Sequence, residues 1–292
     1  MQFRNIWKIA TTVLAVLVVV VLAGCPDAGN DGGDVDKNGL SVGDVITGGF
    51  TVTVDDDEGG YIATRDFDAN DDGDLLDDGD EKQALVRGRF GSDVSFSADT
   101  VYYLDGAVFI GTNDGNDEAT LTIAAGTLIK GETSQSNPGL LVIDRGGLID
   151  AQGTASNPIV FTSAAPEGER EAGDWGGIVI NGHARVQGNT ATGEGSTGVY
   201  GGTDDDDSSG TMQYIQVQFA GTLFTPENEL NGIAFQGVGS GTTVEYIQVH
   251  QNADDGVEFF GGSVQVKYVV LTGNQDDSLD FDDGWNGSAQ FV

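Results

Sequence analysis

Two pairs of adjacent aspartates lie near the C-terminal end of the sequence: Asp254 and Asp255 form the first pair, and Asp276 and Asp277 form the second. If the pairs lie one above the other, their carboxyl groups repel, and a bound cation or raised pKa values would relieve the repulsion. Calcium prefers carboxylate oxygens and is the first candidate cation. Two other interpretations stay open. Carboxyl groups about 5–5.5 Å apart are typical of retaining glycosidases, and aspartates also make side-chain turns at chain corners.

A second acidic segment, residues 66–81, has the ligand spacing of a calcium-binding loop. Counted from Asp68, oxygen-bearing side chains stand at loop positions one, three, five and seven, and Gly73 stands at position six, where such a loop turns sharply. The predicted ligands are Asp68, Asn70, Asp72, Asp74 and Asp77, with Asp78 as the alternative to Asp77. Position twelve is Gly79 in place of a bidentate Glu, so the segment resembles the short Asp-rich loops of dockerin or thrombospondin-type repeats. A solvated acidic loop is the other interpretation.

The aspartate pairs belong to short apolar patterns that repeat along the chain. The recurring segments are Leu121–Ile129 with Leu141–Ile149, Ile233–Phe235 with Val257–Phe259 and Leu279–Phe281, and Tyr246-Ile247 with Tyr268-Val269 and Phe291-Val292. The distance along the chain from one copy to the next is nearly constant. Short strands at a fixed period are typical of a β-solenoid, in which each coil buries its inward residues against its neighbours. Within this pattern Glu258 and Asp280 alternate with apolar residues and are expected to point outward.

Two further segments carry a resemblance to a known family. Residues 153–163 (Gly-Thr-Ala-Ser-Asn-Pro-Ile-Val-Phe-Thr-Ser) and 175–180 (Trp-Gly-Gly-Ile-Val-Ile) resemble the right-handed parallel β-helices of the pectate-lyase-like superfamily. Residues 254–262 followed by 276–280 resemble those of β-helix surface lipoproteins of bacteria. The resemblance covers roughly residues 100–292 and implies an all-β fold, a right-handed parallel β-helix. It does not imply one activity, because such folds host many unrelated functions.

The resemblance also implies two kinds of polysaccharide chemistry against which the residues can be compared. Lyases of the superfamily use calcium, clustered aspartates and a basic proton acceptor, but Lys267 is the one Lys or Arg after Arg185. Glycoside hydrolases of the superfamily use clustered aspartates, and the candidates for catalysis are Asp254, Asp255, Asp276 and Asp277. The two histidines, His183 and His250, are too few for a zinc site without carboxylate ligands and are expected to have core or surface roles.

The N-terminus has the pattern of a secretory signal peptide. Arg4 and Lys8 precede an apolar run from Ile9 to Leu22, which is too short for a membrane-spanning helix. The ending Leu22-Ala23-Gly24-Cys25 resembles a bacterial lipobox, which implies removal of residues 1–24 and acylation of Cys25. Attachment to the membrane would then be through acyl chains on Cys25. The alternative is that Cys25, the sole cysteine, is a small residue near an ordinary cleavage site.

Charge narrows the range of partners. The formal net charge is −35, which is the wrong sign for a nucleic-acid partner and for direct contact with anionic lipids. The predicted organisation is a signal peptide at 1–24, a flexible tether at 25–45, an Asp-rich calcium-loop or capping segment at 46–98 and the β-helix at 99–292. We expect the β-helix to be incomplete at Val292, because the last strand pattern stops within a coil.

The predicted function is that of a lipid-anchored, calcium-binding β-helix protein of the cell envelope, at the outer membrane or cell surface, with an adhesion or glycan-binding role. A polysaccharide or a surface partner is its expected ligand. The alternative is an extracellular polysaccharide-degrading enzyme that uses the stacked aspartates.

Overall fold

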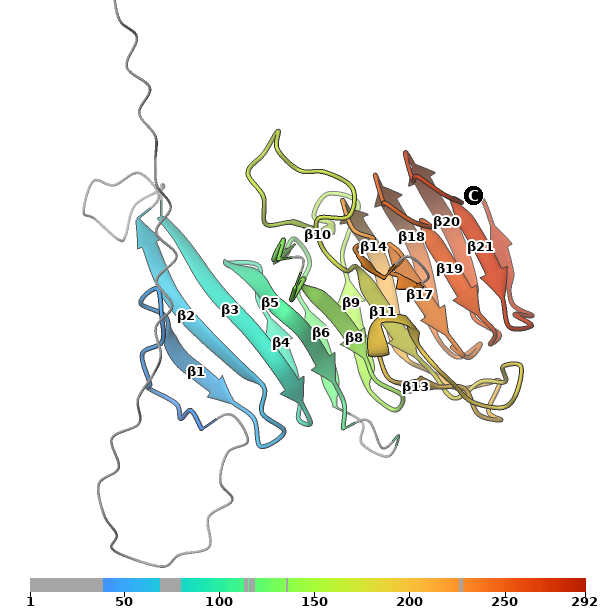
Figure 1. Cartoon of the computed structure of the whole chain (residues 1–292), viewed down its shortest axis with the longest axis horizontal. Coiled ribbons are helices and arrows are strands. Elements are labelled where there is room, and N and C mark those ends of the chain that lie inside the picture. Colours follow the sequence, from blue (N-terminus) through green and yellow to red (C-terminus); the bar gives the residue numbers. More distant parts are fainter. Residues whose placement is uncertain (1–38, 69–79, 113–114, 116–118, 135, 226–227) are drawn as a thin grey trace, which may run out of the picture. The chain divides into compact units, whose positions relative to one another are not determined.

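The computed structural model describes residues 39–292 except 69–79, 113–114, 116–118, 135 and 226–227. Three parallel sheets form the body of this region, and the chain visits them in turn, so that each circuit adds one coil (Figure 1). This is the right-handed parallel β-helix that the sequence predicts. In the described part of the chain, no helix has the length and apolar character needed to cross a membrane. Cys25, Asn70, Asp72, Asp74, Asp77 and the side chain of Asp68 lie outside the described residues, so the predictions made for them stay predictions.

Each sheet collects one strand or half-strand from successive coils. Sheet I consists of the second halves of β3 (Asp80–Phe90) and β5 (Thr100–Ile110), then β8 (Leu140–Ile143), β11 (Ile178–Asn181), β17 (Ile233–Gln236), β19 (Val257–Phe260) and β21 (Leu279–Asp282). Sheet II consists of β4 (Val94–Phe96), β6 (Thr120–Ile123), β9 (Leu148–Gln152), the first halves of β14 (Gly210–Gln218), β18 (Thr243–His250) and β20 (Gln265–Thr272), and β22 (Ser288–Gln290). Sheet III consists of the first halves of β3 and β5, then β7 (Leu128–Gly131), β10 (Ile159–Ser163) and the second halves of β14, β18 and β20.

An antiparallel hairpin lies against the first coil. Strands β1 (Thr51–Asp55) and β2 (Tyr61–Asp68) pair with each other, and β2 pairs with β3. The hairpin buries Phe50, Val52, Tyr61 and Ala63 in a small core of its own. The edge of the first coil is therefore paired, which removes a site of edge-to-edge association.

Strand pairing confirms the repeats in the last coils and corrects one earlier in the chain. Ile233 pairs with Val257 and Val257 with Leu279, in the register that the sequence predicts. The recurrence of Leu121–Ile129 as Leu141–Ile149 does not correspond to stacking of the two segments in that register. Leu121 pairs with Ile149, while Leu141 pairs with Val108 and Ile178. The two segments look alike because each is a strand, a glycine turn and a strand, but one joins sheets II and III and the other joins sheets I and II.

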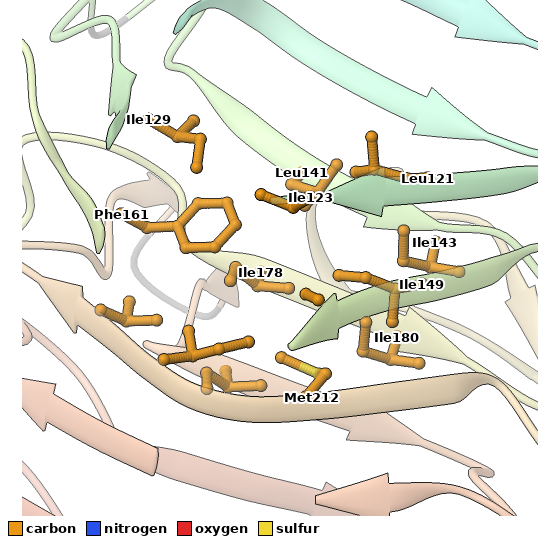
Figure 2. Packing of buried hydrophobic residues seen from close by; sticks show 14 of the residues in the cluster. Leu121, Ile123, Ile129, Leu141, Ile143, Ile149, Phe161, Ile178, Ile180 and Met212 are labelled. Atoms are coloured by element: carbon orange, nitrogen blue, oxygen red, sulfur yellow. The ribbon is translucent and has the colours of Figure 1, made fainter. Parts of the chain in front are cut away.

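The interior is filled by apolar side chains from all three sheets. Strand β5 shows the underlying period, because buried and partly exposed residues alternate along its whole length. Figure 2 shows Leu141 and Ile178 from sheet I, Leu121 and Ile149 from sheet II and Phe161 from sheet III meeting in the interior of successive coils. Each fully buried large side chain contributes roughly 1.5–3 kcal/mol relative to an exposed one. This core holds the backbone of every coil in place.

Sheet I is also covered on its outer side, but only over part of its length. All four residues of β8, β11 and β17 are buried, and their sequences, LLVI, IVIN and IAFQ, are accordingly nearly continuous apolar runs. In β19 and β21 the first outer position is acidic, Glu258 in VEFF and Asp280 in LDFD, and is only partly buried. The strand sequences thus change from nearly continuous apolar runs to apolar residues interrupted by an outward-facing acidic residue where the cover over sheet I ends.

Two excursions from the coils supply this cover. The first, residues 182–209, contains β12 (Ala191–Thr192), the 3-10 turn η1 (Glu194–Ser196) and β13 (Val199–Tyr200). The second, residues 221–230, contains the hairpin of β15 (Leu223–Thr225) and β16 (Asn228–Glu229). An outer apolar cluster includes Leu140, Val142, Val179, Ala234 and, from the second excursion, Leu230. The excursions are therefore packed parts of the fold.

Candidate functional site

The aspartates that precede β19 and β21 lie together at one end of sheet I. Ligand oxygens of Asp254, Asp255 and Asp276 lie within 4.8 Å of one another, and so do those of Asp255, Glu258 and Asp280. Asp255 belongs to both groups and joins them into one site, which we call the carboxylate cluster. Its geometry follows from register, because Glu258 pairs directly with Asp280 across adjacent strands.

Burial and mutual repulsion raise the pKa of three members of the cluster. Burial, the carboxylates of Asp255 and Glu229, and a hydrogen bond with Glu229 raise the pKa of Asp254 to about 7. Burial raises the pKa of Asp255 to about 6, against the opposing effect of a backbone hydrogen bond. Burial and the carboxylate of Asp255 raise the pKa of Glu258 to about 8. The charged neighbours that act on these pKa values are all carboxylates, so the site has an excess of negative charge at neutral pH.

The two excursions bring further oxygen-bearing residues to the carboxylate cluster. Burial, together with Glu229 and Asp255, raises the pKa of Glu194 on η1. Asn231, which directly follows the second excursion and is 2 % exposed, donates a hydrogen bond from Nδ2 to Oε2 of Glu258 at 2.6 Å. Within the described part of the chain, the buried Oδ1 of Asn231 accepts no hydrogen bond. Asn231 thus presents an amide beside the carboxylates, while its carbonyl oxygen has no donor among the described residues.

The turn that carries Asp254 and Asp255 is built tightly against the next coil. The backbone N–H of Asp277 donates to Oδ1 of Asp255 at 2.8 Å, and Nδ2 of Asn252 donates to the carbonyl oxygen of Asp255 at 2.7 Å. A Cβ atom on Gly256 would lie 2.7 Å from the carbonyl oxygen of Ser278, so a larger residue would push the coils apart. Asp277 therefore contacts Asp255 through its backbone N–H, while its carboxylate helps to raise the pKa of Asp255 but is in neither three-residue group.

The arrangement allows two kinds of chemistry. Two groups of three carboxylates that share Asp255 fit a hard divalent cation, since calcium takes six to eight oxygen ligands with flexible geometry. The same residues also place a protonated acid, Glu258, beside carboxylates, which is the composition of a glycosidase site. Only the first use removes the repulsion among all the carboxylates at once.

Three of the cluster-facing residues were not predicted from the sequence. Glu194, Glu229 and Asn231 belong to segments that do not take part in the strand repeats, and their neighbours include Gly, Thr and Asn. Their position follows from strand pairing. Because Ile178 pairs with Ile233, the extra residues between these two strands must loop out of the coil and return to it. The shift from IAFQ to VEFF and LDFD was the available signal that something polar faces sheet I here.

The acidic run Asp204–Asp207 is a structural loop. Asp205 accepts a hydrogen bond from the Arg185 backbone at 3.1 Å and forms an ion pair with the Arg185 side chain at 2.8 Å. Asp207 accepts a hydrogen bond from the backbone N–H of His183 at 2.9 Å. The loop closes the first excursion against the coil, so its acids have structural partners.

The other residues considered for catalysis lie away from the carboxylate cluster. His250 is on β18, where Nδ1 is 2.8 Å from Oγ1 of Thr272 and the ring packs edge-on against Phe219. Lys267 is on β20 in sheet II, paired with Glu245 and Gln290. Neither offers the carboxylate cluster a basic proton acceptor, as a lyase requires.

Comparison with known proteins agrees with this architecture. The family model for the pectate-lyase-like β-helix domain matches residues 88–292. Neither a curated protein nor a solved structure gives a significant match. The match spans more than half of the chain and includes all the strands that carry the carboxylate cluster. This chain therefore belongs to the family of pectate-lyase-like β-helix domains.

Proposed function

We propose that this protein is a lipid-anchored β-helix protein of the cell envelope that binds a divalent cation, calcium first, in the carboxylate cluster and engages extracellular polysaccharide without cleaving it. The observation that carries the cation site is the sharing of Asp255 between two groups of three carboxylates. A site with this excess of negative charge gains stability from any hard cation that replaces the protons on Asp254, Asp255 and Glu258.

The cation has a structural consequence in this arrangement. Asp254 and Asp255 belong to a coil turn, whereas Glu194 and Glu229 belong to the excursions that cover sheet I. Without a cation, repulsion between these groups favours separation of the cover from the coils. A bound cation joins them, because anionic oxygens from both sides then share one positive centre.

Thermal unfolding of the full chain, purified in detergent, tests the cation site. At pH 7.5, calcium is expected to raise the Tm relative to excess chelator, because a ligand that binds only the folded state stabilises it. Asp255→Asn should remove most of that shift, since it takes a charge from both groups. Glu167→Gln, at an exposed turn outside the cluster, is the matched control and should keep the shift. Identical Tm values with calcium and with chelator in the unmodified chain would overturn the cation proposal.

Membrane attachment rests on Cys25 and is tested separately. Cys25→Ser should abolish incorporation of a labelled fatty acid and move the protein from the membrane fraction to the soluble fraction, because acyl chains and not a spanning helix form the anchor. The control is the unmodified chain expressed in parallel. A Cys25→Ser protein that remains in the membrane fraction would contradict the lipid anchor.

A glycoside hydrolase is the second candidate, and the raised pKa of Glu258 favours it. At pH 6 to 7 this side chain holds a proton that it could donate to a leaving oxygen, while Asp280 or Asp255 supplies a carboxylate. A reducing-sugar assay on neutral and acidic polysaccharides decides between the candidates. Release of sugar ends that falls at least a hundredfold in Glu258→Gln would establish the enzyme and overturn the non-cleaving role.

A further inference from the structure

A ladder of aromatic rings runs along the corner between sheets II and III, on a different side of the coils from the carboxylate cluster. The rings belong to Tyr214, Tyr246, Tyr268 and Phe291, one from each of four successive coils. Neighbouring ring centroids lie 4.3, 4.5 and 5.0 Å apart, and the interplanar angles are 2°, 12° and 3°. The rings are therefore parallel, and the stack follows the direction in which coils are added.

The backbone at these corners is unusual for aromatic residues. The four residues have φ values of 51°, 57°, 58° and 59°, in the left-handed region. That conformation costs an L-residue roughly 1–2 kcal/mol, and glycine or asparagine adopts it more readily. Stacking offsets part of this cost, at about 0.5–1.5 kcal/mol per ring pair. A strained conformation repeated four times with aromatic side chains points to a use for the rings beyond turning the chain.

A groove of about 480 Å³ lies along the ladder. The four rings line it together with Gln216 and Gln248, which occupy paired positions on β14 and β18. Tyr246 and Tyr268 are 38 % and 36 % exposed, so the ring edges are open to solvent. A volume of about 300–1,000 Å³, an apolar lining and a few polar groups are typical of a small-molecule or oligomer site.

Charge and periodicity identify the kind of ligand. None of the described residues that line the groove is charged, although the chain has a net charge of −35. A cationic ligand would be drawn to the acidic surfaces instead, and an anionic ligand would find no positive partner. The aromatic ring repeats over four coils and the amide over two, with Val270 in the next paired position, so the lining presents a recurring ring beside two amides and an apolar side chain to a linear repeating ligand. Amide groups of glutamine and phenol groups of tyrosine donate and accept hydrogen bonds, as sugar hydroxyls do.

We infer that the aromatic ladder and its groove form a binding site for an unbranched neutral polysaccharide that lies along the coil-stacking direction. The inference rests on the polysaccharide-binding part of the proposed function and assigns it to a surface distinct from the carboxylate cluster. The ring edges and apolar strand residues contact the sugar rings, and Gln216 and Gln248 bind hydroxyl groups. The groove lies outside sheet I, so occupation of the cation site is not required for it to form.

The test is binding of defined polysaccharides to the full chain in detergent, measured by affinity electrophoresis and calorimetry. The probes are a linear neutral β-glucan, a linear glucomannan, anionic polygalacturonate and cationic chitosan. The variant is the pair Tyr246→Asn and Tyr268→Asn, because asparagine tolerates the left-handed corner and removes the ring. Phe67→Ala, which removes an exposed aromatic ring from β2, is the matched control.

The expected result is binding of at least one neutral polysaccharide, weakened at least tenfold in the double variant and unchanged in Phe67→Ala. The calcium-dependent rise in Tm should persist in the double variant, which separates this site from the cation site. The inference is overturned if neither neutral polymer binds, if the double variant binds as well as the unmodified chain, or if chitosan alone binds. It is also overturned if the double variant abolishes only self-association seen by light scattering, since a second copy of the chain would then be the occupant.

Discussion

On sheet I, carboxylates lie one above another from β19 to β21; at the corner between sheets II and III, aromatic rings do the same from β14 to Phe291. In both places the coil repeat puts like beside like at about 4.8 Å, the strand spacing. The carboxylates repel one another, and burial with this repulsion raises the pKa of Glu258 to about 8, whereas the rings attract and form a stack. In a repeating fold, the residue at a given position contacts the equivalent residue of the next coil. Stacked acidic residues therefore need a counter-ion, whereas stacked aromatic rings stabilise one another.

Loss of the shared core is expected to have the largest effect on both regions. The buried ring of Phe259 stacks between Phe235, at 5.5 Å, and Trp285, at 4.4 Å. Phe259→Ala should reduce the free energy of unfolding by about 3–5 kcal/mol, because it removes a large buried side chain and leaves a cavity. Denaturant unfolding measures this. Phe281→Ala removes the paired ring one coil further on, where it is 60 % exposed, and should cost less than about 1 kcal/mol. Equal losses in the two variants would mean that the core does not continue as described.

The pH dependence of stability should separate the two regions next. The folded-state pKa values of Asp254, Asp255 and Glu258 are about 7, 6 and 8, above the ordinary values of 3.8 and 4.5. The folded chain therefore keeps protons that the unfolded chain releases. Their contribution to stability is fully present below about pH 4 and is lost as the pH rises to about 8. In chelator the Tm should fall over this range, and calcium should restore it mainly above pH 6. A chelated protein that is more stable at pH 8 than at pH 5 would contradict this assignment.

Removing one repelling carboxylate should stabilise the protein when no cation is bound. Glu258→Gln should raise the Tm in chelator, because the neutral amide avoids the cost of charging a buried acid. The difference from the unmodified chain should appear above about pH 4.5 and level off above about pH 8. In calcium the sign should reverse, since the variant lacks one ligand. Differential scanning calorimetry in both conditions tests the reversal, and a variant less stable in chelator as well would show that Glu258 is a structural acid.

The smallest effect is expected for a single ring of the ladder. Tyr246→Asn removes two stacking contacts but relieves an aromatic residue of a left-handed backbone. The two contributions oppose each other, so stability should change by less than about 2 kcal/mol. Urea unfolding measures the change, with Tyr246→Phe as the control that keeps the ring. A much larger loss in Tyr246→Asn would mean that the ladder holds the coils together and would leave less reason to assign it a ligand.

In both regions, the features that repeat once per coil could be predicted from the sequence. The register of Ile233, Val257 and Leu279 was predictable, because coils without excursions keep a nearly constant length. That register places Asp254 over Asp276 and Glu258 over Asp280, so the framework of the carboxylate cluster was predictable as well. Tyr246, Tyr268 and Phe291 were recognised as a repeat for the same reason.

The remaining features depend on chain segments that break the period. Glu194, Glu229 and Asn231 reach the carboxylate cluster from excursions whose path is set by packing on the outer side of sheet I. No local pattern encodes that path. The likeness of residues 121–129 to residues 141–149 was misleading, because glycine turns with positive φ at Gly126 and Gly146 serve two different corners of the coil. A turn motif identifies a corner without saying which one.

Strand register is kept from coil to coil while the connecting segments differ in length, and this affects how such a protein can evolve. Ile178 and Ile233 pair as closely as Ile233 and Val257 do, although the first connection is more than twice as long as the second. Lengthening a corner adds little closure entropy, about 0.6 kcal/mol for each doubling of loop length. Insertions at the corners should therefore be tolerated without loss of the β-helix. Duplication of one coil has the complementary effect, since it copies a carboxylate pair and a ladder position together and extends both surfaces in a single genetic event.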